Sequence, residues 1–233
     1  MLGIIGAMDK EVDDLKDLMN EAGQVKVEEH AGMQFWIGTL SGKEVVLVRS
    51  GIGKVNAAVA AEALSAIYNV EAIINSGIAG SLDARIDIGD IVLSTDAVEH
   101  DMNVLNLGYA RGIVPDQENS VYVADEKLRK IAKEVCEEVC PDIKVFEGRV
   151  VTGDIFVSEK KMKDKMIAEF NGMCTEMEGA AIAHTAWLNK VPFLIIRSIS
   201  DKADDSASMD YPSFQKKAIE NEEKLITEML KRM

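Results

Sequence analysis

Acidic side chains follow several strand-like segments, and carboxyl groups at such positions can perform acid–base chemistry. Glu11 lies one turn into the helix predicted after the apolar segment 2–6, and Asp201 directly follows the apolar segment 193–199. Arg197 lies inside this second apolar segment. An unpaired buried charge is strongly destabilising, so we expect Arg197 to have an acidic partner in a structural ion pair. Because ligands of α/β proteins bind beyond the carboxyl ends of strands, Glu11 and Asp201 are candidate catalytic residues.

A second pair of acids, Glu176 and Glu178, occurs in the segment TEMEGAA. On a regular helix, side chains two residues apart point about 200° away from each other. Both can therefore face one site only if they precede the first regular turn. We expect that one of them faces solvent or interacts with the dipole at a helix N-terminus.

Two glycine-containing segments also follow predicted strands. SGIGK at 50–54 begins like a dinucleotide-binding fingerprint, but Asn56 stands in place of its third glycine. This segment, with Ile52 at its centre, is either a tight turn or a turn whose backbone amides border a small polar ligand. GIAG at 77–80 has two similar interpretations. Its glycines either provide a positive φ in a turn, or their lack of bulk lets the backbone approach a ligand closely.

The histidines and cysteines do not form a metal-binding pattern. His30, His100 and His184 are far apart in the sequence, and Cys136 and Cys140 lack further ligands nearby. Zinc sites require closely spaced ligand pairs, so we predict no metal. The two cysteines are interpreted as small buried hydrophobic residues.

Strand-length apolar segments alternate with helical patterns along almost the whole chain. Strands are predicted at 2–6, 25–29, 33–40, 44–49, 72–76, 90–97, 144–152 and 193–199, and helices at 12–19, 55–67, 125–139, 158–170, 177–188 and 211–231. Strands that alternate with helices of ten residues or more imply parallel crossovers and a sheet covered on both faces. We therefore predict an α/β fold, a three-layer α/β/α sandwich around a mixed, mostly parallel sheet. With no repeat or linker, residues 1–233 are expected to form a single domain; the long irregular segment is 102–119.

Composition limits the partners and the compartment. The chain of 233 residues has 26 Lys and Arg against 40 Asp and Glu, a net charge of −14. Binding to nucleic acids and anionic membranes depends on clustered positive charge, so we expect neither as a partner. No apolar run reaches the length of about 18 residues that a membrane-spanning helix needs. Three cysteines without a recognisable signal peptide favour the cytoplasm.

Six segments taken together resemble one family. They are GIIGAMDKEV (3–12), SGIGKVNAA (50–58), INSGIAGSL (74–82), VTGDIFV (151–157), TEMEGAAIAH (175–184) and RSISDKAD (197–204). Their order and content resemble the bacterial 5′-methylthioadenosine/S-adenosylhomocysteine nucleosidases. This resemblance implies a nucleoside phosphorylase-like fold, a homodimer, and no metal or cofactor. It also implies hydrolysis of the N-glycosidic bond of methylthioadenosine, S-adenosylhomocysteine and 5′-deoxyadenosine, which releases adenine and serves methionine salvage.

The resemblance also implies a role for each matched residue. Glu11 would activate the attacking water with help from Arg197, while Asp201, oriented by Ser200, would assist protonation of adenine N7. Adenine leaves poorly until a ring nitrogen is protonated, so the reaction needs an acid near the base and a carboxylate at the opposite face of the ribose, as in glycosidases. An acid donor at neutral pH needs a raised pKa, which burial near apolar Ile199 would provide.

Further residues would contact the substrate. Glu178 and Met177 would hold the ribose hydroxyls, Phe156 would stack on adenine, and the backbone of Val157 would read the edge of the base. The remaining implied contacts are Ile52, Ile78, Ala79, Gly80 and Glu176. The 5′-substituent pocket would include Met102, Leu107 and Pro115, partly from a second subunit, with Tyr211 over it.

The sequence departs from the family pattern where substrate preference is decided. Ile78 stands where several relatives carry Ser or Thr, HDMN at 100–103 differs from the more usual HDAD, and Leu107 replaces a frequent Phe. The alternatives are an aminodeoxyfutalosine nucleosidase, a phosphate-dependent purine nucleoside phosphorylase, and a nucleoside-binding protein without turnover. A phosphorylase needs a cluster of cationic and amide donors for its anion, and Glu11 fits poorly beside phosphate.

Overall fold

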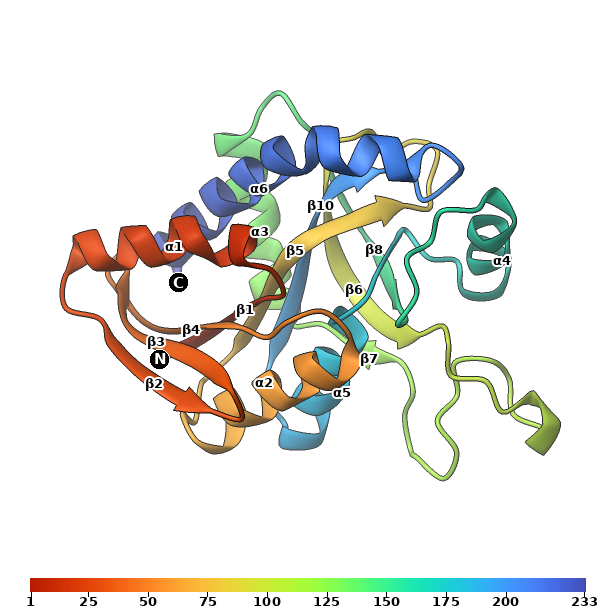
Figure 1. Ribbon diagram of the computed structural model, residues 1–233, viewed down its shortest axis with the longest axis horizontal. Coiled ribbons are helices and arrows are strands. Elements are labelled where there is room, and N and C mark those ends of the chain that lie inside the picture. Colours follow the sequence, from red (N-terminus) through yellow and green to blue (C-terminus); the bar gives the residue numbers. More distant parts are fainter.

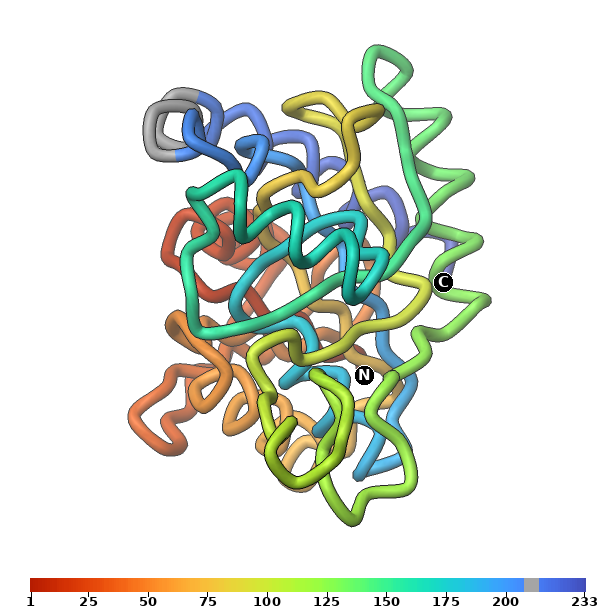
Figure 2. The backbone as a smooth tube through the Cα atoms, turned by 90° about the vertical axis from the view of Figure 1, so that its right-hand side faces the viewer, coloured from red at the N-terminus to blue at the C-terminus, as the bar shows by residue number. Residues whose placement is uncertain are grey.

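A computed structural model describes the backbone of residues 1–233 and the side chains of residues 1–207 and 214–233. Figure 1 shows a central sheet between two layers of helices, and Figure 2 marks in grey the short stretch near the start of the last helix. Helices α1, α3 and α6 contact one face of the sheet, and α2 and α5 pack together on the other. The predicted three-layer α/β/α architecture is confirmed.

The elements follow one another in the predicted alternation. The strands are β1 (Leu2–Gly6), β2 (Lys26–His30), β3 (Met33–Leu40), β4 (Lys43–Arg49), β5 (Ile73–Ser81), β6 (Ile91–Glu99), β7 (Tyr122–Val123), β8 (Val145–Thr152), β9 (Cys174–Glu176) and β10 (Phe193–Asp201). The helices are α1 (Asp9–Ala22), α2 (Lys54–Ala66), α3 (Glu126–Val139), α4 (Lys160–Phe170), α5 (Gly179–Asn189) and α6 (Ala207–Arg232), with a 3₁₀ turn, η1 (Leu105–Leu107). Strands β7 and β9 and the turn η1 were not predicted.

The strand order is β10-β6-β8-β9-β5-β1-β4-β3-β2, and β10 also pairs with β5. Because of this extra pairing, the strands from β10 through β9 to β5 close on themselves, while β1, β4, β3 and β2 extend outward. The sheet is mixed, as predicted, although its parallel strand pairs do not outnumber the antiparallel ones. Parallel pairs (β1–β4, β1–β5, β5–β10, β6–β8 and β8–β9) and antiparallel pairs (β2–β3, β3–β4, β5–β9, β6–β7 and β6–β10) are equally numerous.

Strands β5 and β10 run farther than predicted. The GIAG segment at 77–80 lies inside β5, where it pairs with the end of β10, from Arg197 to Asp201. The interpretation of this segment as a turn is therefore wrong. Gly77 and Gly80 lie outside the positive-φ region, so the chain requires their small size rather than their conformational freedom.

The side chains of the central strands form the core. All residues of β1, β5 and β10 are buried, which fits strands covered by helices on both faces. The alanine-rich helix α2 packs closely on α5 through small buried residues such as Ala60, Ala61 and Ala183. Among the residues that the structure describes, no helix is long and apolar enough to cross a membrane.

Candidate active site

The ends of β1, β5, β9 and β10 surround one cavity of about 530 Å³. Its lining brings together residues from distant parts of the sequence: Ala7, Met8, Glu11, Ile52, Ile78, Ala79, Gly80, Phe156, Thr175, Glu176, Met177, Glu178, Ser200 and Asp201. Most of the site residues proposed from the sequence are in this set. The cavity lies beyond strand ends, as expected for a ligand site of an α/β protein.

Glu11, in the first turn of α1, accepts hydrogen bonds from three backbone amides. Its Oε2 accepts hydrogen bonds from the N–H groups of Ala7 (2.7 Å) and Met8 (3.0 Å), and its Oε1 accepts one from Ile78 (3.3 Å). Burial raises the pKa of Glu11, although Arg197 and these amides oppose the shift. A fixed carboxylate with a raised pKa is suited to accept a proton from water.

Arg197 has the acidic partner that its buried position requires. The residue is 1% exposed, and its Nη2 lies 2.6 Å from Oε2 of Glu176 and 2.5 Å from Oδ1 of Asn75. Burial alone would lower the pKa of Arg197, but nearby carboxyl groups, Glu176 first, raise it above its usual value. The predicted structural ion pair is confirmed, and Arg197 carries a permanent positive charge beside the cavity.

Glu176 and Glu178 both face inward, so the expectation of a solvent-facing partner is wrong. They are 7% and 8% exposed. Glu176 ends β9, and α5 begins only at Gly179, so the pair precedes the first regular turn. Glu176 accepts the N–H groups of Glu178 (3.1 Å) and Gly179 (2.7 Å), which confirms the alternative that one acid interacts with a helix N-terminus.

Glu178 also forms a hydrogen bond with the turn at 50–54. Its Oε1 accepts the N–H of Gly53 at 2.8 Å, and the next amide, of Lys54, donates to Asp154. These two amides are therefore taken by the chain's own carboxylates instead of bordering a ligand. Burial, and next the charge of Glu176, raise the pKa of Glu178 to about 7.

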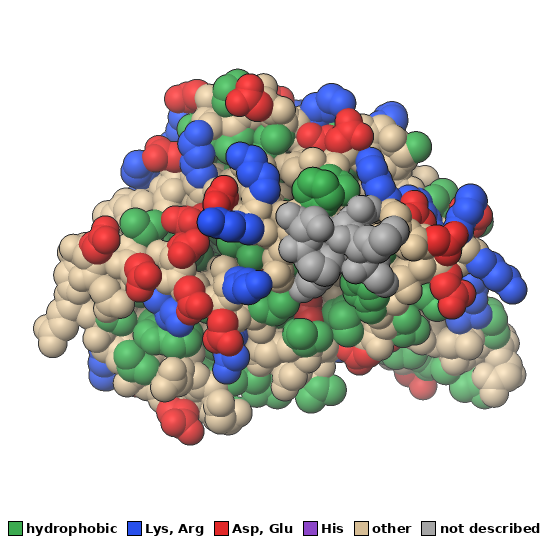
Figure 3. Space-filling model, turned by 45° about the horizontal axis from the view of Figure 1, so that its top comes forward, with side chains coloured by type: hydrophobic (Ala, Val, Ile, Leu, Met, Phe, Trp, Pro, Cys, Tyr) green, Lys and Arg blue, Asp and Glu red, His purple; other side chains and the backbone are tan. Residues whose placement is uncertain are grey.

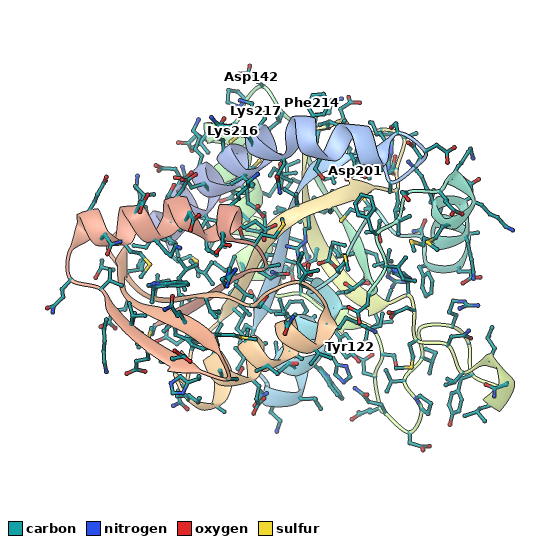
Figure 4. All side chains as sticks on the ribbon, viewed as in Figure 1. Tyr122, Asp142, Asp201, Phe214, Lys216 and Lys217 are labelled. Atoms are coloured by element: carbon teal, nitrogen blue, oxygen red, sulfur yellow. The ribbon has the colours of Figure 1, made fainter. Side chains whose placement is uncertain are left out.

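Asp201 lies at the end of β10 beside the cavity (Figure 4). The Ser200 hydroxyl donates to Oδ2 of Asp201 at 2.9 Å, and the N–H of Ala203 donates to Oδ1 at 2.7 Å. A Cβ added to Gly80 would lie 2.7 Å from Oδ1 of Asp201. The glycine therefore creates the space that this carboxyl group occupies.

Aromatic and apolar groups also border the site. Phe156 is 48% exposed and lines the main cavity. Val157 lines a small adjoining recess of about 30 Å³ together with Gly80 and Asp201. A flat aromatic ring beside a recess that contains a carboxyl group and backbone is suited to bind a planar heterocycle.

Three predicted residues that the structure describes, all meant for the 5′-substituent pocket, do not line this cavity. Met102, Leu107 and Pro115 lie in a segment that extends away from the body of the fold (Figure 1), and Leu107 is 64% exposed. Tyr211 lies outside the residues whose side chains are described. Their assignment to a 5′-substituent pocket stays a prediction.

Sequence reasoning missed several supporting residues. Asn75 bridges Arg197 to the carbonyl of Ile5, and the Thr152 hydroxyl donates to Glu176. Both belong to the quoted strand-end segments, so a search for polar side chains inside apolar strands would have found them. Among the described side chains, no group of three or more His, Cys, Asp or Glu is placed to hold a metal ion.

The raised pKa of Glu178 predicts a pH-dependent stability. Its folded-state pKa of about 7 exceeds the unfolded value of 4.5, so its stabilising contribution is complete below 4.5 and is lost as the pH rises through 7. The wild-type melting temperature should therefore fall relative to that of Glu178→Gln between pH 4.5 and pH 7. Differential scanning calorimetry of both proteins measures this, and a constant difference across that range would contradict the assignment.

Comparisons with known proteins agree with this geometry. The sequence model of the Phosphorylase superfamily matches residues 1–231. A 5′-methylthioadenosine/S-adenosylhomocysteine nucleosidase of an Exiguobacterium species is 38% identical over 233 residues, covering 100% of this chain and 98% of that protein. The chain therefore belongs to the phosphorylase superfamily and, within it, to the 5′-methylthioadenosine/S-adenosylhomocysteine nucleosidases.

Solved structures are also similar to this chain. The Neisseria meningitidis nucleosidase in complex with methylthio-immucillin-A is 35% identical, with a TM-score of 0.93 and coverage of 100% of this chain and 99% of that chain. The futalosine hydrolase of Helicobacter pylori is 30% identical, with a TM-score of 0.93 and coverage of 100% and 97%. The nucleoside phosphorylase-like fold implied by the sequence is thereby confirmed.

Proposed function

We propose that this protein hydrolyses the N-glycosidic bond of 5′-methylthioadenosine and S-adenosylhomocysteine and releases adenine. The observation that carries the proposal is a cavity bordered by four carboxyl groups at or just after the ends of β1, β9 and β10, those of Glu11, Glu176, Glu178 and Asp201. Glycosidic hydrolysis needs one carboxyl group for water and another for the leaving group. Names of full-length relatives support the same activity.

The proposed reaction divides between the two ends of the site. Glu11 takes a proton from the attacking water, whose oxygen bonds to C1′ as the bond from C1′ to adenine N9 breaks. Asp201, held by Ser200, gives a proton to adenine N7. Acid and base groups each contribute about 10²–10⁴-fold to such a rate, and the negative charge around the ribose stabilises a cationic sugar.

The other proposed contacts hold the nucleoside between these groups. Glu178 and Met177 bind the ribose hydroxyls, and Phe156 stacks on the base above the recess that Val157 lines. The backbone of Ala79 and Gly80 lines the cavity beside the nucleoside. Cavity walls at Ile52 and Ile78 exclude water from the sugar.

The charges of the cavity favour hydrolysis over phosphorolysis. Phosphate binding requires cationic donors, but the described residues that line the cavity include no Lys or Arg. The nearby Arg197 is already paired with Glu176 at 2.6 Å. The Glu11 carboxylate would repel a phosphate anion at the position of the water.

Substrate range is tested by a panel of nucleosides in phosphate-free buffer. We expect adenine release from methylthioadenosine and S-adenosylhomocysteine, and also from 5′-deoxyadenosine. Turnover of aminodeoxyfutalosine alone would instead support the alternative suggested by the similar futalosine hydrolase. Binding of every nucleoside without adenine release would support a nucleoside-binding protein.

The protein is also proposed to act as a homodimer. Apolar Ile52, Val55 and Val59 are exposed at the start of α2, and Leu105 and Leu107 are exposed on the projecting segment. Exposed apolar clusters of this kind are typical of protein interfaces. A partner subunit seated here would bring Met102, Leu107 and Pro115 to a neighbouring cavity, and sedimentation equilibrium measures the expected mass of two chains.

Location and organisation complete the proposal. All three cysteines are free and buried, which is consistent with a reducing compartment such as the cytoplasm.

One sheet contains strands from Leu2 to Asp201, which supports a single nucleosidase domain over residues 1–233. On the face in Figure 3, basic side chains are interspersed with acidic ones, an arrangement that does not favour nucleic acids or membranes as partners.

The pH dependence of catalysis should reflect the raised pKa of Glu11. Because the ionised form accepts the proton, kcat/KM should rise with pH through a value above the ordinary 4.5. Initial rates between pH 4 and pH 8 give this acid limb, and the limb should persist in Glu178→Gln. An acid limb at or below 4.5 would remove Glu11 from this role.

The close approach of Gly80 to Asp201 predicts a sensitive position. The added methyl group of Gly80→Ala would lie 2.7 Å from Oδ1 of Asp201 and 2.8 Å from Cβ of Ala203, so it should displace the carboxyl group and lower kcat about 10-fold or more. Gly38→Ala, on the distant strand β3, is the matched control. Equal kcat values for the two variants would show that the position of Asp201 is not critical.

A further inference from the structure

The last helix, α6, brings a buried carboxyl group to the back of the candidate site. Gln215, Ala218, Ile219 and Glu222 recur at helical spacing and are all buried. The opposite side of the helix, with Phe214, Lys216 and Lys217, points away from the sheet (Figure 4). Glu222 is 2% exposed, which is unusual for a glutamate.

Glu222 binds the strand that carries the site. Its Oε1 accepts the N–H of Gly77 at 2.5 Å, and the next amide along β5, that of Ile78, donates to Oε1 of Glu11. Two consecutive amides of one strand are thus held by two different carboxyl groups, one from α6 and one from α1. A movement of this backbone would change both hydrogen bonds.

Gly77 also forms the surface against which the reacting groups lie. A Cβ at this position would be 2.9 Å from Oε1 of Glu11 and 3.3 Å from Nη1 of Arg197. The backbone that Glu222 holds therefore contacts the proposed base and its neighbouring cation. The next residue, Ile78, packs with Ala218 and Ile219 of α6, the helix that also carries Glu222.

The surroundings of Glu222 and Glu11 affect their pKa values differently. Burial raises the pKa of Glu222 well above its usual value, and the charge of Glu11 on α1 raises it further. Arg197 on β10, the Gly77 amide and the Ser76 hydroxyl on β5 act in the opposite direction. The groups that shift its pKa come from these three elements rather than from α3, which also packs on α6. With three amide donors, Glu11 ionises more readily than Glu222.

We propose that Glu222 is a positioning residue for hydrolysis, a neutral carboxyl group that fixes the Gly77–Ile78 backbone so that Glu11 keeps its orientation toward the water. This inference rests on the proposed function and adds a residue that never touches the substrate. Its contribution is to the orientation of the base, so it affects the rate more than the affinity for the nucleoside.

The test compares Glu222→Gln, which retains an oxygen acceptor of the same shape, with Glu222→Leu, which removes it. For Glu222→Leu we expect kcat to fall about 10- to 100-fold while KM changes less than about threefold. The acid limb of kcat/KM should also move to higher pH, because a displaced Ile78 amide stabilises the Glu11 carboxylate less. Glu222→Gln should stay within about threefold of wild type and keep the wild-type limb. Glu220→Gln, an exposed position on the same helix, is the control.

Three results would overturn the proposal. The first is a folded Glu222→Leu variant that keeps the wild-type kcat and the wild-type acid limb. The second is an equal loss of kcat in the Gln and Leu variants. The third is an acid limb that moves to lower pH in Glu222→Gln, which would mean that Glu222 is negatively charged. Circular dichroism and adenine affinity establish that each variant is folded, and Glu222→Ser replaces the Leu variant if the latter does not fold. Absence of turnover in the wild-type protein would contradict the proposed function instead.

Discussion

Replacement of Asp201 by Asn is expected to lower kcat for adenine release about 10²–10⁴-fold, the usual contribution of a general acid. The side chains have the same shape, but the amide cannot give a proton to adenine N7. The oxygen that accepts the Ala203 amide at 2.7 Å can be retained, so the loop after β10 should keep its conformation. Stopped or continuous assays of adenine release measure the loss.

The matched control for this variant is Asp205→Asn, an exposed acid four residues farther along the chain. Both proteins should melt within a few degrees of wild type, and only Asp201→Asn should show the loss of kcat. Nucleoside affinity should change much less than kcat, because the lost interaction develops in the transition state. A wild-type rate in Asp201→Asn would eliminate this residue as the acid.

Replacement of Glu11 by Gln is expected to reduce kcat by a similar factor of about 10²–10⁴. The variant loses the proton acceptor, and its amide nitrogen must face either the amides of Ala7 and Met8 or that of Ile78, all of which are donors. Near neutral pH the unmatched amide nitrogen lowers the stability of the folded protein, but a second effect offsets part of this loss. Burial raises the pKa of Glu11, so ionisation of this group is a cost to the folded state that Gln does not have.

Glu21→Gln, on the same helix but exposed, is the control for Glu11→Gln. The melting temperature and kcat of each variant separate loss of catalysis from loss of folding. Wild-type turnover by Glu11→Gln would show that another group activates the water. A large fall in its melting temperature at pH 7 would instead contradict the environment described for this carboxyl group.

The parts of the site that lie at strand ends could be predicted from the sequence. Apolar runs identify strands that helices cover on both faces, so the positions of Glu11 and Asp201 follow from the ends of β1 and β10. The acids Glu176 and Glu178 are a contrasting case. Their spacing excluded a shared helix face, but the short strand β9, which places both before α5, has too few residues to give a pattern.

Other features depend on contacts that no local pattern encodes. GIAG at 77–80 has the composition of a turn but continues β5, because Glu11 and Asp201 occupy the space where side chains would be. Glu222 lies 18 residues after the last family-like segment, which ends at Asp204, and its only signal is an acid on the apolar side of a helix. The assignment of Leu107, on the projecting segment, to a 5′-substituent pocket depends on the proposed second subunit, which no pattern within one chain describes.

The most direct test of the central claim is adenine release from methylthioadenosine with and without inorganic phosphate, with identification of the sugar product by mass spectrometry. Hydrolysis predicts equal rates in both buffers and free methylthioribose as the product. Release that requires phosphate and yields the sugar 1-phosphate would contradict the account, since it would place an anion where the four carboxyl groups of the cavity lie.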